Sequence, residues 1–312
     1  MIDKKVLEEL ITNINNRTGI RSDILEKDYY VCLVLKDLSV KQNELKAYFK
    51  GGTALYKILD QMNRFSEDID LTVKVDKNSS NNSNKTRLKK SALGYKINGL
   101  ELIKDETKVD IGSITSFYKY DSLFASNELF KSGKVQIEAT SFTVSEPISK
   151  YKIEPLIYKF ATDEEKNILK NKYSISGFEI EIIKLERIFV DKIFAAEFYY
   201  ERKMFDDVSK HLYDISVMMN NENIKKLLTN NKELIKLIDY KRKEEISRIG
   251  GISENKKIFD FEYMRLDFSK DMISSFERMQ RIYVLDDKYL LSLEEVKKKI
   301  KELHKLFKKI GM

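Results

Sequence analysis

The feature that most constrains the fold of this chain is a pair of adjacent glycines between two apolar runs. Ala47 to Lys50 has the length and composition of a strand, and Gly51-Gly52 follows it directly. After the glycines, apolar residues recur at steps of three and four as far as Met62, which is the period of a helix. The sequence therefore predicts a strand, a tight glycine turn and a helix whose N-terminus lies at the turn.

A second strand is predicted downstream, and it carries two aspartates. From Ile69 to Val75 apolar and polar residues alternate, which is typical of a half-buried strand. Asp68 and Asp70 then share one face of this strand. Two neighbouring carboxylates repel each other unless a cation lies between them, so the pair is either a divalent-metal site or a solvated strand face.

Other side chains near these two motifs are candidates for the same site. We expect the backbone of Gly51, Gly52 and Thr53 to approach a phosphate, because glycine allows close contact and a helix N-terminus attracts anions. Ser66 lies two residues before Asp68, so its hydroxyl faces the same way and is a candidate for contact with a phosphate or with the metal.

The first half of the chain contains further candidates for contact with a phosphate or a metal. Lys57, one turn into the predicted helix, either reaches a phosphate or is solvated. Glu138 alternates with Val135 and Ile137 and is the candidate for a third carboxylate on a neighbouring strand. Asp110 is the weaker alternative.

The remaining patterns predict an α+β fold with two lobes. Residues 1–160 are predicted as a core lobe with a mixed or antiparallel sheet and N-terminal helices, and residues 161–312 as a mainly α-helical lobe. The boundary is placed near Phe160 because β-branched alternation mostly ends there. The finer expectations are helices over 22–38 and 87–103, a polar loop over 78–84, and strands near 111–120 and 135–144.

Composition narrows the class of protein. The 312 residues carry a net charge of +7, which suits a polyanionic partner such as nucleic acid. One cysteine and two histidines exclude an internal disulfide and a His/Cys zinc site, and they favour a reducing, cytoplasmic compartment. The sequence shows neither a signal peptide nor a membrane span, so no membrane partner is expected.

Three motifs together resemble a known family. Phe49 to Lys57, Arg64 to Leu71 and Glu26 to Tyr29 resemble the AbiEii/AbiGii toxins, which include the MenT toxins, within the DNA polymerase β-like nucleotidyltransferases. The resemblance implies a toxin of a toxin–antitoxin or abortive-infection system, with a cognate antitoxin encoded nearby. It also implies transfer of a nucleoside monophosphate from an NTP to RNA, above all to the 3′ acceptor end of tRNA, with Mg²⁺ or Mn²⁺, and a resulting block of translation.

The resemblance extends into the second lobe. Leu185 to Ala195 resembles the family helix that carries an essential lysine, and Lys210 to Ile215 resembles its later aspartate motif, which implies Lys192 and Asp214. Lys192 is expected to bind the triphosphate, in a cleft shared with the two aspartates. Asp214 either accepts the proton of the attacking hydroxyl or holds Lys192. His211 is kept out of the catalytic set, because a histidine bonded to backbone is more common there.

Other functions remain open at this stage. The acceptor is alternatively a protein or a small molecule, or the chain is a non-catalytic subunit that binds nucleotide or RNA. The last helix is predicted from the capping-box spacing of Ser292 and Glu295. Its basic face either follows an RNA backbone or is a solvated helix face, and it comprises Lys297, Lys298, Lys301, Lys305, Lys308 and Lys309.

Overall fold

The computed structural model of the chain consists of two compact units, which are described separately. Unit 1 comprises residues 1–60 and 65–183, and unit 2 comprises residues 61–64 and 184–312. In the part of the chain that the structure describes, no helix is long and apolar enough to cross a membrane. The described residues are 2–59, 64–76, 78–124, 133–143, 145–247 and 250–312.

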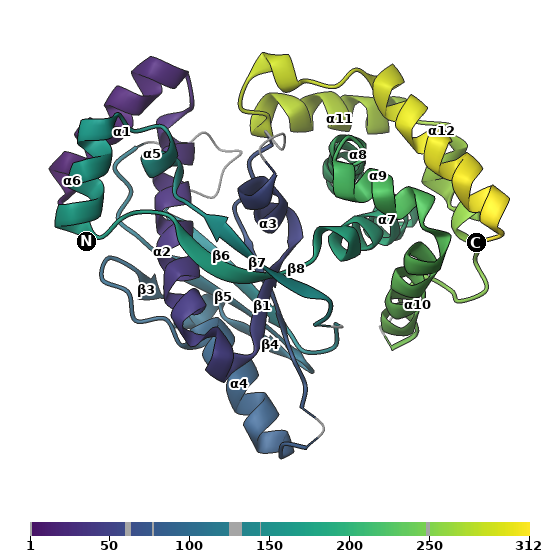
Figure 1. Cartoon of the computed structure of the whole chain (residues 1–312), viewed down its shortest axis with the longest axis horizontal. Helices are drawn as coiled ribbons and strands as arrows, with labels where there is room; N and C mark the ends of the chain where they lie inside the picture. Colours follow the sequence, from purple (N-terminus) through teal and green to yellow (C-terminus); the bar gives the residue numbers. More distant parts are fainter. Residues whose placement is uncertain (1, 60–63, 77, 125–132, 144, 248–249) are drawn as a thin grey trace. The chain divides into compact units, whose positions relative to one another are not determined.

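Unit 1 contains the sheet and six of the described helices (Figure 1). The strands are β1 Ala47–Lys50, β2 Ile69–Val73, β3 Glu101–Leu102, β4 Lys108–Asp110, β5 Ser113–Lys119, β6 Lys134–Thr140, β7 Ile148–Ile153 and β8 Phe178–Ile183. The helices are α1 Lys4–Thr18, α2 Ser22–Leu45, α3 Gly51–Ile58, α4 Asn81–Leu93, α5 Leu156–Lys159 and α6 Asp163–Tyr173, with a 3-10 turn, η1, at Lys104–Glu106.

The described strands form one mixed sheet in the order β3-β5-β6-β2-β1-β8-β7, and β4 pairs with β5. β2 runs antiparallel to β1 and parallel to β6, while β1 also pairs in parallel with β8. The two strands predicted to carry the glycine turn and the aspartates therefore lie side by side in the middle of the sheet. This confirms the predicted α+β class with a mixed sheet.

The two faces of the sheet differ in polarity, as expected for strands of alternating pattern. Phe49, Leu71 and Ile137 are fully buried on one face. Helix α4 lies on this face, because the hydroxyls of Ser116 and Tyr118 both donate hydrogen bonds to the Ala92 carbonyl oxygen. The opposite face of the central strands carries the polar residues, and the candidate carboxylates belong to it.

Unit 2 is helical (Figure 1). Its core is formed by the apolar faces of α7, α8 and α11 together with the buried stripe of α12. The capping box that the sequence predicts at Ser292 and Glu295 is present at the start of α12. The elements are α7 Leu185–Glu201, α8 Phe205–Met218, α9 Glu222–Thr229, α10 Asn231–Ser247, α11 Lys270–Tyr283, α12 Leu293–Ile310 and the 3-10 turns η2 Ile258–Asp260, η3 Glu262–Arg265 and η4 Asp287–Tyr289.

The division between the units lies further along the chain than the position expected near Phe160. Unit 1 continues to Ile183, because β8 pairs with β1 in parallel and with β7 in antiparallel fashion. A strand that follows a helix and pairs with a distant partner gives no local signal of the lobe it belongs to. The mainly helical part therefore begins at Lys184.

The polar segment after β2 also differs from the expectation. The predicted loop over 78–84 contains the first turn of α4, which begins at Asn81 because the Ser80 side chain accepts a hydrogen bond from the Ser83 N–H. The helix predicted to reach residue 103 ends at Leu93, before Gly94. Composition suggested a loop here, whereas the N-cap decides where the helix begins.

Candidate active site

The glycine turn is in close contact with one of the two aspartates. Gly51 has φ +82°, a backbone conformation that favours glycine. A Cβ atom at this position would lie 1.9 Å from Asp70 Oδ2 and 2.8 Å from Asp70 Cγ. Only a residue without a side chain fits here, so Gly51 allows the start of α3 and the Asp70 carboxylate to approach each other.

Thr53 links the glycine turn to the segment that precedes β2. Its Oγ1 donates a hydrogen bond of 2.5 Å to the Asp68 carbonyl oxygen and lies 3.0 Å from Ser66 Oγ. Thr53 is fully buried, whereas Ser66 is half-buried. The first turn of α3 therefore fixes the backbone at Asp68, and Ser66 contributes to the same contact.

The register of the sheet places Glu138 next to Asp70. Asp70 pairs with Lys50 on β1 and with Glu138 on β6, and paired residues of neighbouring strands project from the same face. Asp68 immediately precedes β2, and Asp68, Asp70 and Glu138 are all half-buried. Asp110 is exposed on β4, which pairs with β5.

The donor set of this site suits a hard divalent cation. Mg²⁺ prefers carboxylate oxygens and keeps several of its waters, so two carboxylates with access to solvent are sufficient protein ligands. The contact of Gly51 with Asp70 leaves the carboxylate beside backbone N–H groups at the start of α3. Among the described residues, no group of three or more His, Cys, Asp or Glu side chains is gathered as a metal site. Glu138 as a third ligand stays a prediction.

The environment of Lys57 differs from both predicted alternatives, contact with a phosphate and exposure to solvent. Its side chain is 3% exposed, so it is not a solvated lysine. The ammonium forms an ion pair with Asp28 and donates a hydrogen bond of 3.0 Å to the Glu154 carbonyl oxygen. Asp28 also accepts a hydrogen bond of 2.6 Å from the Leu156 N–H. Because these partners already occupy the ammonium, we assign Lys57 to the support of α3 and not to a phosphate.

The rest of the motif at the start of α2 is also structural. Glu26 accepts hydrogen bonds from Ser122 Oγ at 2.7 Å and from the Leu123 N–H at 2.8 Å. Burial raises the pKa of Glu26, while these hydrogen bonds oppose the increase. Lys27 is 1% exposed and lies 3.2 Å from Glu67, the residue before Asp68. The motif thus supports the segment that carries the aspartates.

Unit 2 contains a buried ion cluster around Asp214. Lys192 Nζ lies 2.8 Å from Asp214 Oδ2, so the two residues implied by the family pattern are in contact. Arg64 binds both carboxylate oxygens, with Nε 2.8 Å from Oδ1 and Nη2 2.9 Å from Oδ2. Asp214 is 0% exposed, Arg64 4% and Lys192 8%.

The charges of this cluster decide what Asp214 can do. Burial raises the pKa of the Asp214 carboxyl, but the Arg64 and Lys192 cations outweigh it and hold that pKa well below its ordinary value. A buried carboxylate with both oxygens bound by cations is a poor proton acceptor. Of the two roles that the sequence left open, the geometry favours holding Lys192. Arg64 was not among the site residues predicted from the sequence, although it begins one of the motifs that resemble the family.

His211 lies beside this cluster on α8. Its ring stacks on Tyr199 with the centroids 5.4 Å apart. Burial lowers the pKa of His211 well below its ordinary value, and the Lys192 ammonium lowers it further. Its Nδ1 atom is buried without a hydrogen-bond partner in the described part of the chain. The ring is therefore neutral and packed against Tyr199, and the exclusion of His211 from the catalytic set stays a prediction.

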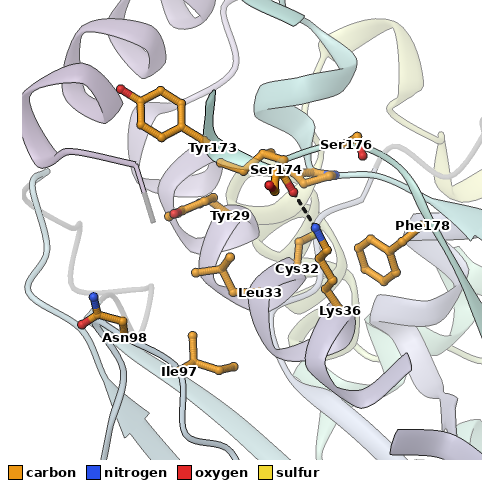
Figure 2. Close-up of a pocket in the computed structure, with 12 residues that line it drawn as sticks. Tyr29, Cys32, Leu33, Lys36, Ile97, Asn98, Tyr173, Ser174, Ser176 and Phe178 are labelled. Carbon is orange, nitrogen blue, oxygen red and sulfur yellow. Dashed lines mark hydrogen bonds between the residues drawn. The ribbon is translucent and has the colours of Figure 1, made fainter. Parts of the chain in front are cut away.

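A pocket of about 210 Å³ lies elsewhere in unit 1 (Figure 2). Tyr29, Cys32 and Lys36 of α2 form one wall, and Lys36 donates a hydrogen bond to the Ser174 carbonyl oxygen. Burial raises the pKa of Cys32 to about 12, so its thiol is unreactive at neutral pH. None of the predicted site residues lines this pocket.

Comparisons with known proteins identify the family. A family model of the AbiEii nucleotidyl transferase toxins, described as a type IV toxin–antitoxin system, matches residues 33–295. Among solved structures, one match is MenT4, a nucleotidyltransferase toxin from Mycobacterium tuberculosis, with 11% sequence identity and a TM-score of 0.39 over 97% of this chain and 99% of that chain. No curated protein matches. Because the family model covers more than half of it, the chain is a nucleotidyltransferase that belongs to the AbiEii toxin family of type IV toxin–antitoxin systems.

Proposed function

We propose that this toxin transfers a nucleoside monophosphate from an NTP to the 3′ end of an RNA, with tRNA as the acceptor, and thereby blocks translation. The observation that carries the proposal is the contact between Gly51 and Asp70, because it joins an anion-binding helix start to a metal-binding carboxylate. The net charge of +7 favours RNA over a neutral acceptor. A cytoplasmic site of action follows from this choice of acceptor.

The reaction is a displacement at the α-phosphorus of the NTP. The 3′-hydroxyl oxygen of the RNA forms the new bond to this phosphorus, the bond to the oxygen bridging the α- and β-phosphates breaks, and pyrophosphate leaves. The hydroxyl proton passes to solvent. A positioned site accelerates such a transfer mainly through orientation and electrostatics, so each residue is assigned one of these two tasks.

In unit 1 the residues bind and orient the phosphates. Asp68 and Asp70 would hold Mg²⁺ or Mn²⁺, which neutralises charge on the triphosphate when it is bound. The N–H groups of Gly51, Gly52 and Thr53 would contact phosphate oxygens, and the contact of Thr53 with Asp68 fixes these two parts relative to each other. Ser66 and Glu138 are the further candidates of this site.

In unit 2 Lys192 would offset the charge that develops on the departing pyrophosphate. Asp214 shares its single negative charge between two cations, so Lys192 is only partly neutralised and retains an affinity for phosphate. Arg64 and Asp214 act through Lys192, because they fix its ammonium and touch no reacting atom in this scheme. We therefore assign them as positioning residues.

The test is a transfer assay with α-labelled NTPs, Mg²⁺ and total tRNA. We expect label at the RNA 3′ end, and we expect Asp70→Asn to lower the rate at least about a thousandfold, since it removes one carboxylate charge from the metal site. The matched control is Asp105→Asn, an exposed aspartate of the η1 turn in the same unit, which should leave the rate unchanged.

Two outcomes would contradict the proposal. Equal labelling by Asp70→Asn would remove Asp70 from the site. Label that enters protein or a small molecule, and never RNA, would assign the other acceptor class. Growth arrest on induction in a host, relieved by Asp68→Ala, would link the transfer to toxicity.

A further inference from the structure

Helix α12 has two sharply different faces. Val296, Ile300, Leu303 and Phe307 are 0–1% exposed and form its packed side. At 100° per residue these four positions fall within an arc of about 60°, so the packing of the helix fixes which side is exposed. Exposed residues occupy the opposite side.

Lysines dominate that opposite side. Lys298, Lys301, Lys305, Lys308 and Lys309 are exposed and fall within an arc of about 100°, and we call them the α12 lysine face. In the part of the chain that the structure describes, none of the five has an ion pair with a carboxylate. Some exposed lysines elsewhere in unit 2 do have carboxylate partners, since Lys225 pairs with Glu222 and Lys288 with Asp286.

The helix carries a large share of the charge of the chain. It holds seven lysines against three glutamates, a net +4, while the whole chain carries +7. Favourable interaction with the helix dipole accounts for lysines in the last turn, such as Lys308 and Lys309. It does not account for Lys298 and Lys301, which lie more than one turn from the end.

The spacing of these charges matches a phosphate backbone. From Lys298 to Lys309 the helix rises about 16 Å at about 1.5 Å per residue. One strand of a DNA duplex presents a phosphate every ~3.4 Å along its axis, and the phosphates of an RNA duplex follow one another slightly more closely, hence about five or six over this length. The lysine face therefore offers about one cation per phosphate, without the apolar anchors that a protein partner would need.

We propose that the α12 lysine face binds the phosphate backbone of the acceptor RNA. The proposal rests on the proposed function for the identity of the acceptor. Contacts of this kind position a substrate without reading its sequence. They would strengthen binding of the RNA and leave binding of the NTP unchanged.

The experiment compares two triple variants with equal loss of charge. Lys301→Gln/Lys305→Gln/Lys308→Gln removes three lysines of the face, and Lys166→Gln/Lys170→Gln/Lys172→Gln removes three from α6, where three acidic residues balance them. Binding of a fluorescent RNA stem-loop is measured by anisotropy over a series of salt concentrations, without NTP. Circular dichroism checks that α12 remains helical, as glutamine is a good helix former.

We expect the α12 variant to weaken RNA binding roughly tenfold or more at low salt. The slope of log Kd against log salt should fall by about 2 to 3, because each lost phosphate contact contributes about 0.7–0.9. The α6 variant should match the wild type. In transfer assays the α12 variant should raise KM for RNA and leave KM for NTP unchanged.

Two results would overturn the proposal. One is an equal Kd and an equal salt slope for the α12 and α6 variants. The other is an α12 variant that binds RNA as the wild type does but has lost binding to poly-glutamate, a model of an acidic protein. That result would assign the face to an acidic protein. A wild type that labels no RNA, together with an α12 variant that loses RNA binding, would refute the proposed function and still support the RNA-binding face.

Discussion

In the proposed reaction the aspartates of the two units have two opposite uses of the same side chain. Asp70 lies half-buried on a strand, beside a glycine that keeps the neighbouring backbone close. Asp214 is 0% exposed, and both its oxygens are bound by the cations of Arg64 and Lys192. A carboxylate that recruits a metal must stay accessible, whereas one that orients a lysine can be buried with its partners.

The comparison separates the expected effects of mutation. Changes around Asp70 should alter activity more than stability, because Asp70 is only half-buried. Changes around Asp214 should alter stability strongly, because a buried ion cluster that loses one member leaves charge without compensation. The following predictions test this contrast, from the largest expected change in stability to the smallest.

Replacement of Arg64 should have the largest effect on stability. Arg64→Met removes two hydrogen bonds to a fully buried carboxylate, and we expect the free energy of unfolding to fall by about 3–5 kcal/mol in urea denaturation. Arg278→Met is the matched control, because Arg278 pairs with Asp206 on the surface, with side-chain exposures of 50% and 60%. That variant should lose no more than about 1 kcal/mol.

The same residue allows a test of its positioning role. If Arg64 acts through Lys192, then Arg64→Met should lower the transfer rate in the wild type but cause no further loss in a Lys192→Met background. Arg64→Lys should restore part of the activity, since it keeps the charge and loses the two-pronged geometry. Additive losses in the double variant would contradict the assignment.

Replacement of Gly51 should have a smaller effect on stability and a clear effect on activity. Gly51→Ala places a methyl group within 1.9 Å of Asp70 Oδ2, so the carboxylate must move. We expect the free energy of unfolding to fall by about 2–3 kcal/mol, from the left-handed backbone and from the displaced side chain, and the transfer rate to fall about a hundredfold.

The control for this variant is Gly19→Ala. Gly19 has φ +73°, and a Cβ atom there would meet nothing within 4 Å. This variant should lose about 1 kcal/mol from backbone strain alone and retain full activity. Equal loss of activity in the two variants would show that the contact with Asp70 is unimportant.

The sequence predicted the parts of the site that depend on local pattern. The order of strand, glycine turn, helix and Asp-x-Asp strand follows from periodicity and two glycines, and the structure contains it between β1 and β2. Lys192 and Asp214 were implied by family resemblance alone, and their contact was one of two roles left open for Asp214. The two residues lie on successive helices, α7 and α8, and no local pattern links them.

The features that the sequence did not reveal depend on partners far apart in the chain. Arg64 and Asp214 are separated by 150 positions, and periodicity contains no information about such a pair. For Lys57 the sequence allowed contact with a phosphate or exposure to solvent, and it did not reveal the buried ion pair because the partner, Asp28, lies on another helix. The extent of unit 1 was missed for the same reason, since β8 belongs to the sheet only through its pairing with β1 and β7.

The smallest predicted effect concerns His211 and the pH dependence of stability. The pKa of His211 is depressed in the folded protein, chiefly by burial, whereas the unfolded chain binds a proton near pH 6.5. Below that pH the unfolded state holds the additional proton, so folding weakens as pH falls, by at most about 1.4 kcal/mol per pH unit.

His211→Gln should remove this slope between pH 6.5 and 5.5, and His304→Gln, which changes the other histidine of the chain, should retain it. Urea midpoints at the two pH values measure the difference. An unchanged slope in His211→Gln would mean that His211 titrates alike in both states, and the environment beside Lys192 would then be more open to water than the ion cluster implies.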